Sequence, residues 1–286
     1  MIDINALISL LTLEQKDTHR FIGQNYKTAW GRVFGGQVLG QSLHAAYQTV
    51  PKDRIAHSMH GYFILGGDIN IPIEYHVDAI RDGKSFTTRR VVAFQKGKAI
   101  FNMAASFHLK EEGVDHQITM PNVLTPELLL TDIQQAEALK VSDPERFERL
   151  MKAHPQIFEF RPVGKAIYLE NRNSSPLSHI WFKTKVKIVA DISLQHQFLA
   201  FASDYSLLLS ATLPHRKALE NAKMYYASLD HALWFHRDFK IDDWLLYAIE
   251  SPSASNARGF SRGSIFDRSG KMIASSSQEG LMRKYN

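Results

Sequence analysis

The sequence carries an internal repeat, and this repeat constrains the fold more than any other feature of the chain. Residues 57–110 and 229–282 each begin with a histidine-containing aromatic segment, continue through an apolar segment and a small polar turn, and end after a Gly-Lys turn. Phe235 follows Phe63 by 172 residues, and the two Gly-Lys turns are 173 residues apart. A nearly constant offset over so long a stretch indicates a duplicated folding unit.

Each copy of the repeat is preceded by an apolar segment rich in small residues. The segments are VFGGQVLGQSLHAAYQTV at 33–50 and HQFLAFASDYSLLLSATL at 196–213. Both are apolar on nearly every side at helical spacing, which indicates buried helices. Short segments separated by glycine-containing turns follow, so four or five antiparallel strands are expected in each copy. The sequence therefore predicts an α+β fold in which each unit wraps an antiparallel sheet around one long helix.

The segment between the two copies has a different composition. Residues 111–165 contain five prolines, and TPELLLTDIQQAEALK at 125–140 has helical periodicity. We therefore expect an N-terminal unit over residues 1–110, a partly helical linker over 111–165 and a C-terminal unit over 166–286. The strands of the two units are expected to join into one continuous sheet.

Composition and charge exclude several kinds of functional site and partner. The 286 residues include no cysteine, which excludes disulfide scaffolds, thiolate metal sites and cysteine nucleophiles. The formal net charge is +5, and the charges are spread along the chain rather than gathered in Lys/Arg tracts. This pattern fits a solvated surface or a small phosphate-bearing partner, and it argues against nucleic acid.

The distribution of apolar residues indicates where in the cell the protein is expected. The chain has no apolar stretch long enough to span a membrane. Near the N-terminus, helical spacing is seen for Ile4, Leu7, Ile8 and Leu11. The same segment contains Asp3 and has no early positive charge, which argues against a signal peptide. We therefore expect an amphipathic N-terminal helix and a cytoplasmic protein with no membrane insertion. Apolar helices and sheet edges favour a homo-oligomer, a dimer or a tetramer.

Six stretches of the sequence together resemble one known family. They are VFGGQVLGQSLHAA, IRDGKSFTTRRV, FASDYSLL, LDHALWFH, ESPSASNARGFSRG and SSSQEGLMR. The family is the acyl-CoA thioesterase II family, whose members are double-hotdog hydrolases of the bacterial cytoplasm and, as relatives, of peroxisomes. The resemblance covers nearly the whole chain and is weakest in the linker. It implies two tandem hotdog units, an acyl-CoA substrate, hydrolysis of the thioester and no cofactor.

The resemblance also implies a catalytic set. The family has an Asp in the second long helix, a Thr or Ser at the start of the next strand and a Gln in the last strand. Matched by motif, these are Asp204 in FASDYSLL, Ser228 in YASLDHALWFH and Gln278 in SSSQEGLM. Where a bacterial member has Thr, this chain has Ser228, and either residue offers a hydroxyl. One active site per chain is then expected, built mostly from the second unit and closed by the first.

The chemistry of these three side chains suits thioester hydrolysis. A carboxylate in an apolar segment is costly unless it is paired or useful. A low local dielectric raises the pKa of such a carboxyl, which would make Asp204 a better general base. Ser228 and Gln278 are neutral donors and acceptors that can orient the same water. Direct attack by Asp204 to form an anhydride stays open as an alternative.

Five further residues are candidates for binding the substrate. Gly35 and Gly36 precede the first long helix, where backbone N–H groups could stabilise an oxyanion and glycine allows close approach. Tight helix–sheet packing is the structural alternative for these glycines. Arg258, Arg262 and Arg283 lie near the C-terminal catalytic segments and could hold the phosphates of coenzyme A, with surface ion pairs as the alternative.

Three motifs are rejected as functional sites. GFSRG at 259–263 matches the G-x-S-x-G nucleophile elbow, but strand-like sequence continues where the elbow needs a helix. Asp230 and His231 are neighbours in a predicted strand, so they point to opposite faces. HSMH at 57–60 has metal-ligand spacing, but residues i and i+3 of a strand also point to opposite faces. No metal site is therefore expected.

Two other functions compete with thioester hydrolysis. A hotdog enoyl-CoA hydratase would carry Asp, Asn and His close together, and no Asp-x(4)-Asn-x-His occurs in the chain. A non-catalytic acyl-CoA binding protein would need no polar trio, so Asp204, Ser228 and Gln278 argue against it. Tight binding of acyl-CoA without release of CoA would favour it.

Overall fold

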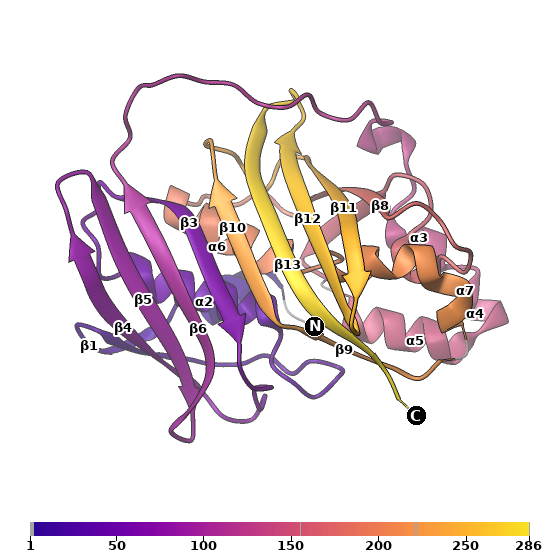
Figure 1. Ribbon diagram of the computed structural model, residues 1–286, viewed down its shortest axis with the longest axis horizontal. Helices are drawn as coiled ribbons and strands as arrows, with labels where there is room; N and C mark the ends of the chain where they lie inside the picture. Colours follow the sequence, from indigo (N-terminus) through magenta and orange to yellow (C-terminus); the bar gives the residue numbers. More distant parts are fainter. Residues whose placement is uncertain (1–2, 155, 221, 286) are drawn as a thin grey trace.

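The computed structural model describes residues 3–154, 156–220 and 222–285, and within these ranges thirteen strands form one antiparallel sheet (Figure 1). The strands of the N-terminal half are β1 (Glu14–Asp17), β2 (Arg20–Gly23), β3 (Ile55–Phe63), β4 (Ile73–Asp82), β5 (Phe86–Gln95) and β6 (Lys98–His108). Those of the C-terminal half are β7 (Phe158–Pro162), β8 (Leu177–Thr184), β9 (Met224–Ser228), β10 (Asp230–Phe235), β11 (Leu245–Ser255), β12 (Arg258–Asp267) and β13 (Met272–Lys284). Their order along the sheet is β1-β2-β4-β5-β6-β3-β10-β13-β12-β11-β8-β7, and β9 pairs with β13 beside this path.

The helices lie between and beside these strands. They are α1 (Ile4–Leu11), α2 (Gly35–Tyr47), η1 (Pro126–Leu128), α3 (Asp132–Ala136), α4 (Leu139–Ser142), α5 (Pro144–Ala153), η2 (Ile167–Leu169), α6 (Ile192–Ser203), η3 (Leu208–His215) and α7 (Arg216–Leu219), where η marks a 3₁₀ helix. The predicted N-terminal amphipathic helix is confirmed by α1, which buries Leu7, Leu10 and Leu11. The predicted helical character of the linker is confirmed by η1 and by α3 to α5.

The sheet divides into two similar halves that meet at β3 and β10. The order β2-β4-β5-β6-β3 in the first half matches β8-β11-β12-β13-β10 in the second, read from the opposite edge. β10 pairs antiparallel with β3, with Asp230 opposite Tyr62 and Trp234 opposite Ser58. The prediction that the strands of the two units join into one continuous sheet is therefore confirmed.

One buried helix accompanies each half of the sheet. α2 and α6 lie side by side on the same face of the sheet (Figure 1). They approach closely at two glycines one turn apart, because a Cβ on Gly36 would lie 2.3 Å from the Phe201 carbonyl oxygen and one on Gly40 would lie 3.2 Å from that of Gln197. Most residues of both helices are buried, as their apolar character on all sides predicts. Each unit is thus a helix wrapped by an antiparallel sheet, which is the expected double hotdog.

Each buried helix is also preceded by a pair of strands, which the sequence analysis does not predict. The pairs are β1 with β2 and β7 with β8. β1 (EQKD) is exposed along its whole length, so it lacks the alternation that identifies a half-buried strand. β7 lies within residues 111–165 and places Phe160 opposite Phe182 of β8. The sheet of the second half therefore begins inside the segment expected to be linker.

The second long helix is shorter than the sequence predicts. A helix is expected over 196–213, but α6 ends at Ser203 and Asp204 is its C-terminal cap residue. Ser206 has a positive φ of 67°, which a right-handed helix does not accommodate, and the chain then continues into η3. The prediction that Asp204 lies within a long helix is therefore wrong, since the carboxylate lies at a helix end.

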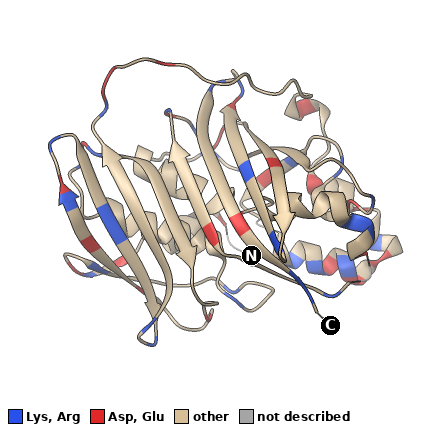
Figure 2. Ribbon diagram, viewed as in Figure 1, with Lys and Arg blue, Asp and Glu red and all other residues tan. Residues whose placement is uncertain are grey.

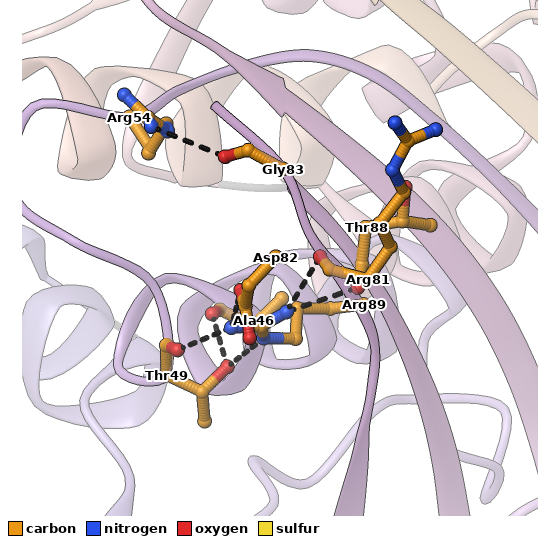
Figure 3. A network of polar contacts seen from close by, with 8 residues as sticks. All are labelled: Ala46, Thr49, Arg54, Arg81, Asp82, Gly83, Thr88 and Arg89. Carbon is orange, nitrogen blue, oxygen red and sulfur yellow. Dashed lines mark hydrogen bonds and ion pairs between the residues drawn. The ribbon is translucent and has the colours of Figure 1, made fainter. Parts of the chain in front are cut away.

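A buried arginine ties the end of α2 to the sheet of the first unit (Figure 3). Arg89 on β5 is 3% exposed and donates hydrogen bonds to the Thr49 carbonyl oxygen at 2.8 Å and to an Asp82 carboxylate oxygen at 2.7 Å. The adjacent Arg90 is exposed and pairs with Asp78 instead. Because a buried charge is costly unless it is paired, these partners explain why one of two neighbouring arginines can point inward.

Charged residues are spread along the chain in both units (Figure 2). The adjacent strands β6, β3 and β10 at the centre of the sheet contain just two Lys, Arg, Asp or Glu residues, Lys98 and Asp230, each at the first position of its strand. Within the described ranges, no helix has the length and apolar character needed to cross a lipid bilayer.

Candidate active site

The three predicted catalytic side chains converge where α6, β9 and β13 meet. Asp204 caps the C-terminal end of α6, Ser228 is the last residue of β9, and Gln278 lies on β13. The Gln278 amide nitrogen donates to one carboxylate oxygen of Asp204 at 2.8 Å and to the Ser228 hydroxyl oxygen at 2.9 Å. Residues far apart in the sequence therefore form one hydrogen-bonded group.

The first unit contributes to this group through the start of α2. The Gly36 N–H donates to the second carboxylate oxygen of Asp204 at 2.9 Å. Gly35 allows the close approach, because a Cβ there would lie 2.7 Å from the same oxygen. The Gly36 N–H is thus engaged by Asp204 rather than directed at a substrate oxyanion. Gly36 also serves the packing of α2 on α6, where a Cβ would meet the Phe201 carbonyl.

The directions of these hydrogen bonds follow from the chemistry of the groups. An ionised carboxylate only accepts, so the amide nitrogen of Gln278, and not its oxygen, must face Asp204. The other amide hydrogen goes to the Ser228 oxygen, which leaves the Ser228 hydrogen available for donation into the cavity. Among the described residues, the buried Oε1 atom of Gln278 has no hydrogen-bond partner. The group thus offers an acceptor at Asp204 and a donor at Ser228.

Burial raises the pKa of Asp204 above the ordinary value of an aspartate, because the carboxylate is poorly solvated. The hydrogen bonds from Gln278 and from the Gly36 N–H act in the opposite direction and partly offset this rise. The Asp204 side chain is half-buried and lines a cavity, so a water or a substrate can reach it. A reachable carboxylate with raised basicity is what a general base requires.

The cavity beside this group has a volume of about 460 Å³. That volume lies within the range of small-molecule sites, roughly 300–1,000 Å³. Asp204, Ser228 and Gln278 form part of its polar lining. The other walls are mainly apolar, and they include Phe34, Met151, Phe160, Ile180, Leu208 and Leu209. The arrangement therefore suits a ligand with a long apolar part and a reactive polar end.

The three arginines predicted to hold phosphates lie on the opposite face of the sheet. The register places Ser261 of β12 directly opposite Gln278 of β13, and both side chains are buried. Alternate residues of a strand point to opposite faces, so Arg258, Arg262 and Arg283 point away from this side. The structure therefore does not bring these arginines to the Asp204 cavity.

Two of these arginines are engaged in ion pairs. The Nε atom of Arg262 lies 2.6 Å from a Glu250 carboxylate oxygen, and that of Arg258 lies 2.9 Å from a Glu279 carboxylate oxygen. The side chains involved are between 37% and 60% exposed. These contacts correspond to the alternative given for the arginines, surface ion pairs.

Several residues that line the cavity are not among the predicted site residues. Tyr205 follows Asp204 directly and packs on Phe34 with ring centroids 4.5 Å apart. Asp132 and His154 form a buried pair in which Nε2 lies 2.9 Å from a carboxylate oxygen. Both members of this pair lie in the predicted linker. The tertiary fold brings the linker to the cavity, and no spacing in the sequence indicates this contact.

Two rejected motifs have the local geometry on which their rejection rests. GFSRG lies inside β12, which continues as a strand to Asp267, whereas a nucleophile elbow turns into a helix. Asp230 accepts from the Glu279 N–H at 2.6 Å, whereas the His231 Nε2 lies 2.9 Å from the Ser203 hydroxyl oxygen. Burial lowers the pKa of His231 to about 3, so its ring is neutral at the end of α6.

Comparisons with known proteins point to one family. Residues 153–281 match the family model described as acyl-CoA thioesterase, and residues 26–108 match the model of the acyl-CoA thioesterase N-terminal domain. Acyl-CoA thioesterase 2 of Haemophilus influenzae is 40% identical to this chain over 284 residues, which cover 98% of this chain and 98% of that protein.

Solved structures are similar in fold as well. The acyl-CoA thioesterase II TesB2 from Mycobacterium marinum has a TM-score of 0.81 at 36% identity and covers 98% of this chain and 99% of its own. A protein with a hot dog fold from Alicyclobacillus acidocaldarius has a TM-score of 0.77 at 16% identity, which shows the fold alone. The fold is thus the double hotdog, and the chain belongs to the acyl-CoA thioesterase II family, a family of thioester hydrolases.

Proposed function

We propose that this protein hydrolyses fatty acyl-CoA to the free fatty acid and CoA, with a water molecule activated by Asp204. The observation that carries the proposal is the hydrogen-bonded group of Asp204, Ser228 and Gln278 in the wall of an otherwise mainly apolar cavity. The names of the relatives, which are acyl-CoA thioesterases, support the same substrate class.

In the proposed reaction, Asp204 accepts a proton from the water as the water oxygen attacks the carbonyl carbon of the thioester. Ser228, whose oxygen accepts from Gln278, donates its own hydrogen to the water and keeps it in line for the attack. The tetrahedral intermediate collapses by cleavage of the carbon–sulfur bond, which releases the CoA thiolate and the carboxylic acid. The proton on Asp204 then passes to the thiolate or to solvent, which restores the base.

Gln278 and Gly36 are proposed to position the base rather than to contact the substrate. Each donates to a different carboxylate oxygen of Asp204, and each oxygen keeps a lone pair for the water. Their hydrogen bonds lower the pKa of Asp204, whereas burial raises it. The net shift is upward, so the carboxylate is more basic than one on the surface.

The experiment that tests the function separates it from its two competitors. Wild-type protein is given a series of saturated fatty acyl-CoAs with thiol detection, and an enoyl-CoA with detection of hydration. Release of CoA from the saturated substrates is the predicted result. Hydration of the enoyl-CoA without CoA release would identify a hydratase instead, and binding with neither product would identify a binding protein. Within the described chain, the hydrogen-bond partners of Asp204 include no histidine, which favours hydrolysis over hydration.

Isotope labelling tests whether an anhydride forms at Asp204 and is hydrolysed at its aspartyl carbon. In a single turnover in ¹⁸O-labelled water, a general base places the label in the product carboxylate and none in the protein. Attack by Asp204 forms an acyl–aspartyl anhydride, and its hydrolysis at the aspartyl carbon leaves the label in the Asp204 side chain. Mass spectrometry of the peptide that contains Asp204 is expected to show no label. A labelled peptide would replace the water mechanism by the anhydride mechanism.

We also propose that the protein forms homo-oligomers. Tyr62 on β3 is 62% exposed, and the central strands around it contain just Lys98 and Asp230 as charged residues. An exposed sheet face with few charges favours contact with a second copy of the chain. Light scattering should therefore give the mass of two or four chains, and the mass of one chain would contradict this proposal.

A further inference from the structure

A second cavity adjoins the one that contains Asp204. It has a volume of about 880 Å³ and is lined by α1, by the segment at 24–30 and by the linker helix α5. Its apolar lining includes Leu10, Phe147, Ile157 and Phe201. Five residues line both cavities and together form what we call the dividing wall: Trp30, Met151, Ala153, His154 and Tyr205.

Three members of the dividing wall are fixed by specific contacts. The Tyr205 ring packs on Phe34 with centroids 4.5 Å apart, and Trp30 meets the same ring edge-on with centroids 6.2 Å apart. The His154 Nε2 lies 2.9 Å from a carboxylate oxygen of Asp132, and both of these side chains are almost fully buried. Shortening any of the three would remove an aromatic contact or a buried polar pair.

Met151 differs from these three residues. Its thioether is a weak acceptor at most, so shortening the side chain removes no strong hydrogen bond. The side chain is unbranched and has several rotatable bonds, which lets it adapt to a neighbouring ligand. Ala153, the remaining member, is too short to close an opening by itself. Met151 is therefore the member of the dividing wall that can move, or be replaced, at the smallest cost to the surrounding structure.

We propose that Met151 determines acyl-chain length, by closing the acyl cavity against the second cavity. This inference rests on the proposed function, because it requires the thioester to lie at Asp204. From that point the mainly apolar walls formed by Phe160, Ile180 and Leu208 offer a path for the acyl chain. A chain too long for the first cavity must pass Met151, and the apolar lining of the second cavity then receives its end.

The proposal places a specificity-determining residue outside both hotdog units. Met151 lies on α5, within the segment that joins them. The His154–Asp132 pair fixes the C-terminal end of α5 to the start of α3. The linker would thus act as one wall of the substrate site, in addition to connecting the two units.

The test compares three variants on acyl-CoAs from butanoyl-CoA to octadecanoyl-CoA. Met151→Ala should raise kcat/KM for long chains relative to short ones. The expected gain is about fourfold for each methylene that gains a buried place, because such burial contributes about 0.8 kcal/mol. Met151→Trp should lower kcat/KM for long chains relative to short ones. Met120→Ala is the matched control, since it shortens another linker methionine that lines neither cavity in the described chain.

The outcomes distinguish this proposal from the proposed function. A wild type that releases no CoA from any substrate would refute both the function and the role of Met151 that depends on it. With an active wild type, an unchanged chain-length profile in both Met151 variants would refute the role of Met151 alone. A change in KM by the same factor at every chain length would also refute it, because Met151 would then contact the CoA part. Opposite shifts in the two variants support it, and general destabilisation does not produce opposite shifts.

Discussion

The amide nitrogen of Gln278 lies 2.8 Å from a carboxylate oxygen of Asp204, and this contact fixes which atoms of the site donate and which accept. Asp204 accepts, Gln278 donates, and the hydrogen of Ser228 stays available for the cavity. A carboxylate whose pKa burial raises is thereby held by a donor on each oxygen. In the proposed mechanism, one base and one donor act on the same water.

Gln278→Glu tests the contact through the pH dependence of catalysis. A second carboxyl group at hydrogen-bond distance raises the pKa of Asp204 further, because two like charges disfavour ionisation. The base acts in its deprotonated form, so kcat/KM falls as pH falls through that pKa. The acid limb of the variant should therefore lie at higher pH than that of the wild type, with kcat/KM roughly tenfold lower at neutral pH.

The control for this variant is Glu279→Gln. Glu279 is the next residue on β13 and pairs with Arg258 on the opposite face of the sheet. Its pH profile should match that of the wild type. An acid limb that stays in place in Gln278→Glu would show that Asp204 is not the titrating base.

Asp204→Asn should stabilise the folded protein at neutral pH. Burial raises the folded-state pKa of Asp204 above its unfolded value. The stabilisation that Asp204 gives is therefore fully present at pH values below its unfolded-state pKa. It is lost as the pH rises through its folded-state pKa. Asparagine does not titrate, so the free energy of unfolding of the variant minus that of the wild type should increase from acidic to neutral pH.

Denaturant unfolding at several pH values between about 4 and 8 measures this difference. The new amide also fits the site, because the Gln278 amide can turn and accept a hydrogen bond through its Oε1 atom, which has no partner among the described residues of the wild type. A difference that stays constant or decreases with rising pH would mean that burial does not disfavour the ionised Asp204.

Ser228→Ala and Ser228→Thr separate the hydroxyl from the rest of the side chain. Removing the donor should lower kcat by about a hundredfold with little change in KM, because the lost hydrogen bond acts in the reaction rather than in substrate binding. Threonine keeps a hydroxyl and should retain most of the activity. Ser228 is half-buried at the end of β9, so neither change should unfold the protein. Equal kcat values for the two variants would exclude the hydroxyl from the reaction.

Gly35→Ala tests how closely the position of Asp204 is set. A Cβ at this residue would lie 2.7 Å from a carboxylate oxygen of Asp204 and 3.0 Å from the Phe63 ring, so side chains rather than backbone must shift. Displacement of the base should cost roughly ten- to a hundredfold in kcat. Thermal unfolding should show a smaller loss of stability than in the control variant Gly40→Ala.

The control for Gly35→Ala is Gly40→Ala. A Cβ at Gly40 would crowd the Leu11 side chain and the Gln197 carbonyl at the contact of α2 with α6. This overpacking should cost about 1–3 kcal/mol in the free energy of unfolding, while the folded protein keeps its kcat. If the two variants lost stability and kcat in the same proportion, Gly35 would have a packing role and no role in placing Asp204.

The fold was predictable because the two copies of the duplicated unit are still similar in sequence. The alignment of the segments around Phe63 and Phe235 indicated a duplicated unit, and the expectation of one continuous sheet came from reading the two copies as fused hotdog units. The end of α6 was not predictable from apolar periodicity, since the turn depends on the left-handed conformation of Ser206. β1 was missed because it buries no side chain, and without burial a strand has no alternation.

The candidate site was predictable in part. Asp204, Ser228 and Gln278 followed from family motifs, and their spacing alone would not have indicated one site. Strand alternation could have separated Arg283 from Gln278, because the two residues are five positions apart in one strand and an odd offset places side chains on opposite faces. The faces of other strands depend on their register, and the contact of Met151 with the cavity depends on how the linker packs. Neither is encoded in a local pattern.

The turnover of Asp204→Asn on a fatty acyl-CoA, followed by thiol detection alongside direct measurement of acyl-CoA binding, tests the central claim most directly. The account predicts a folded variant with a near wild-type Kd and a kcat lower by about 10²- to 10⁴-fold, the range that general-base catalysis contributes. A folded variant that binds acyl-CoA and turns it over at a near wild-type rate would contradict the claim that Asp204 activates the water.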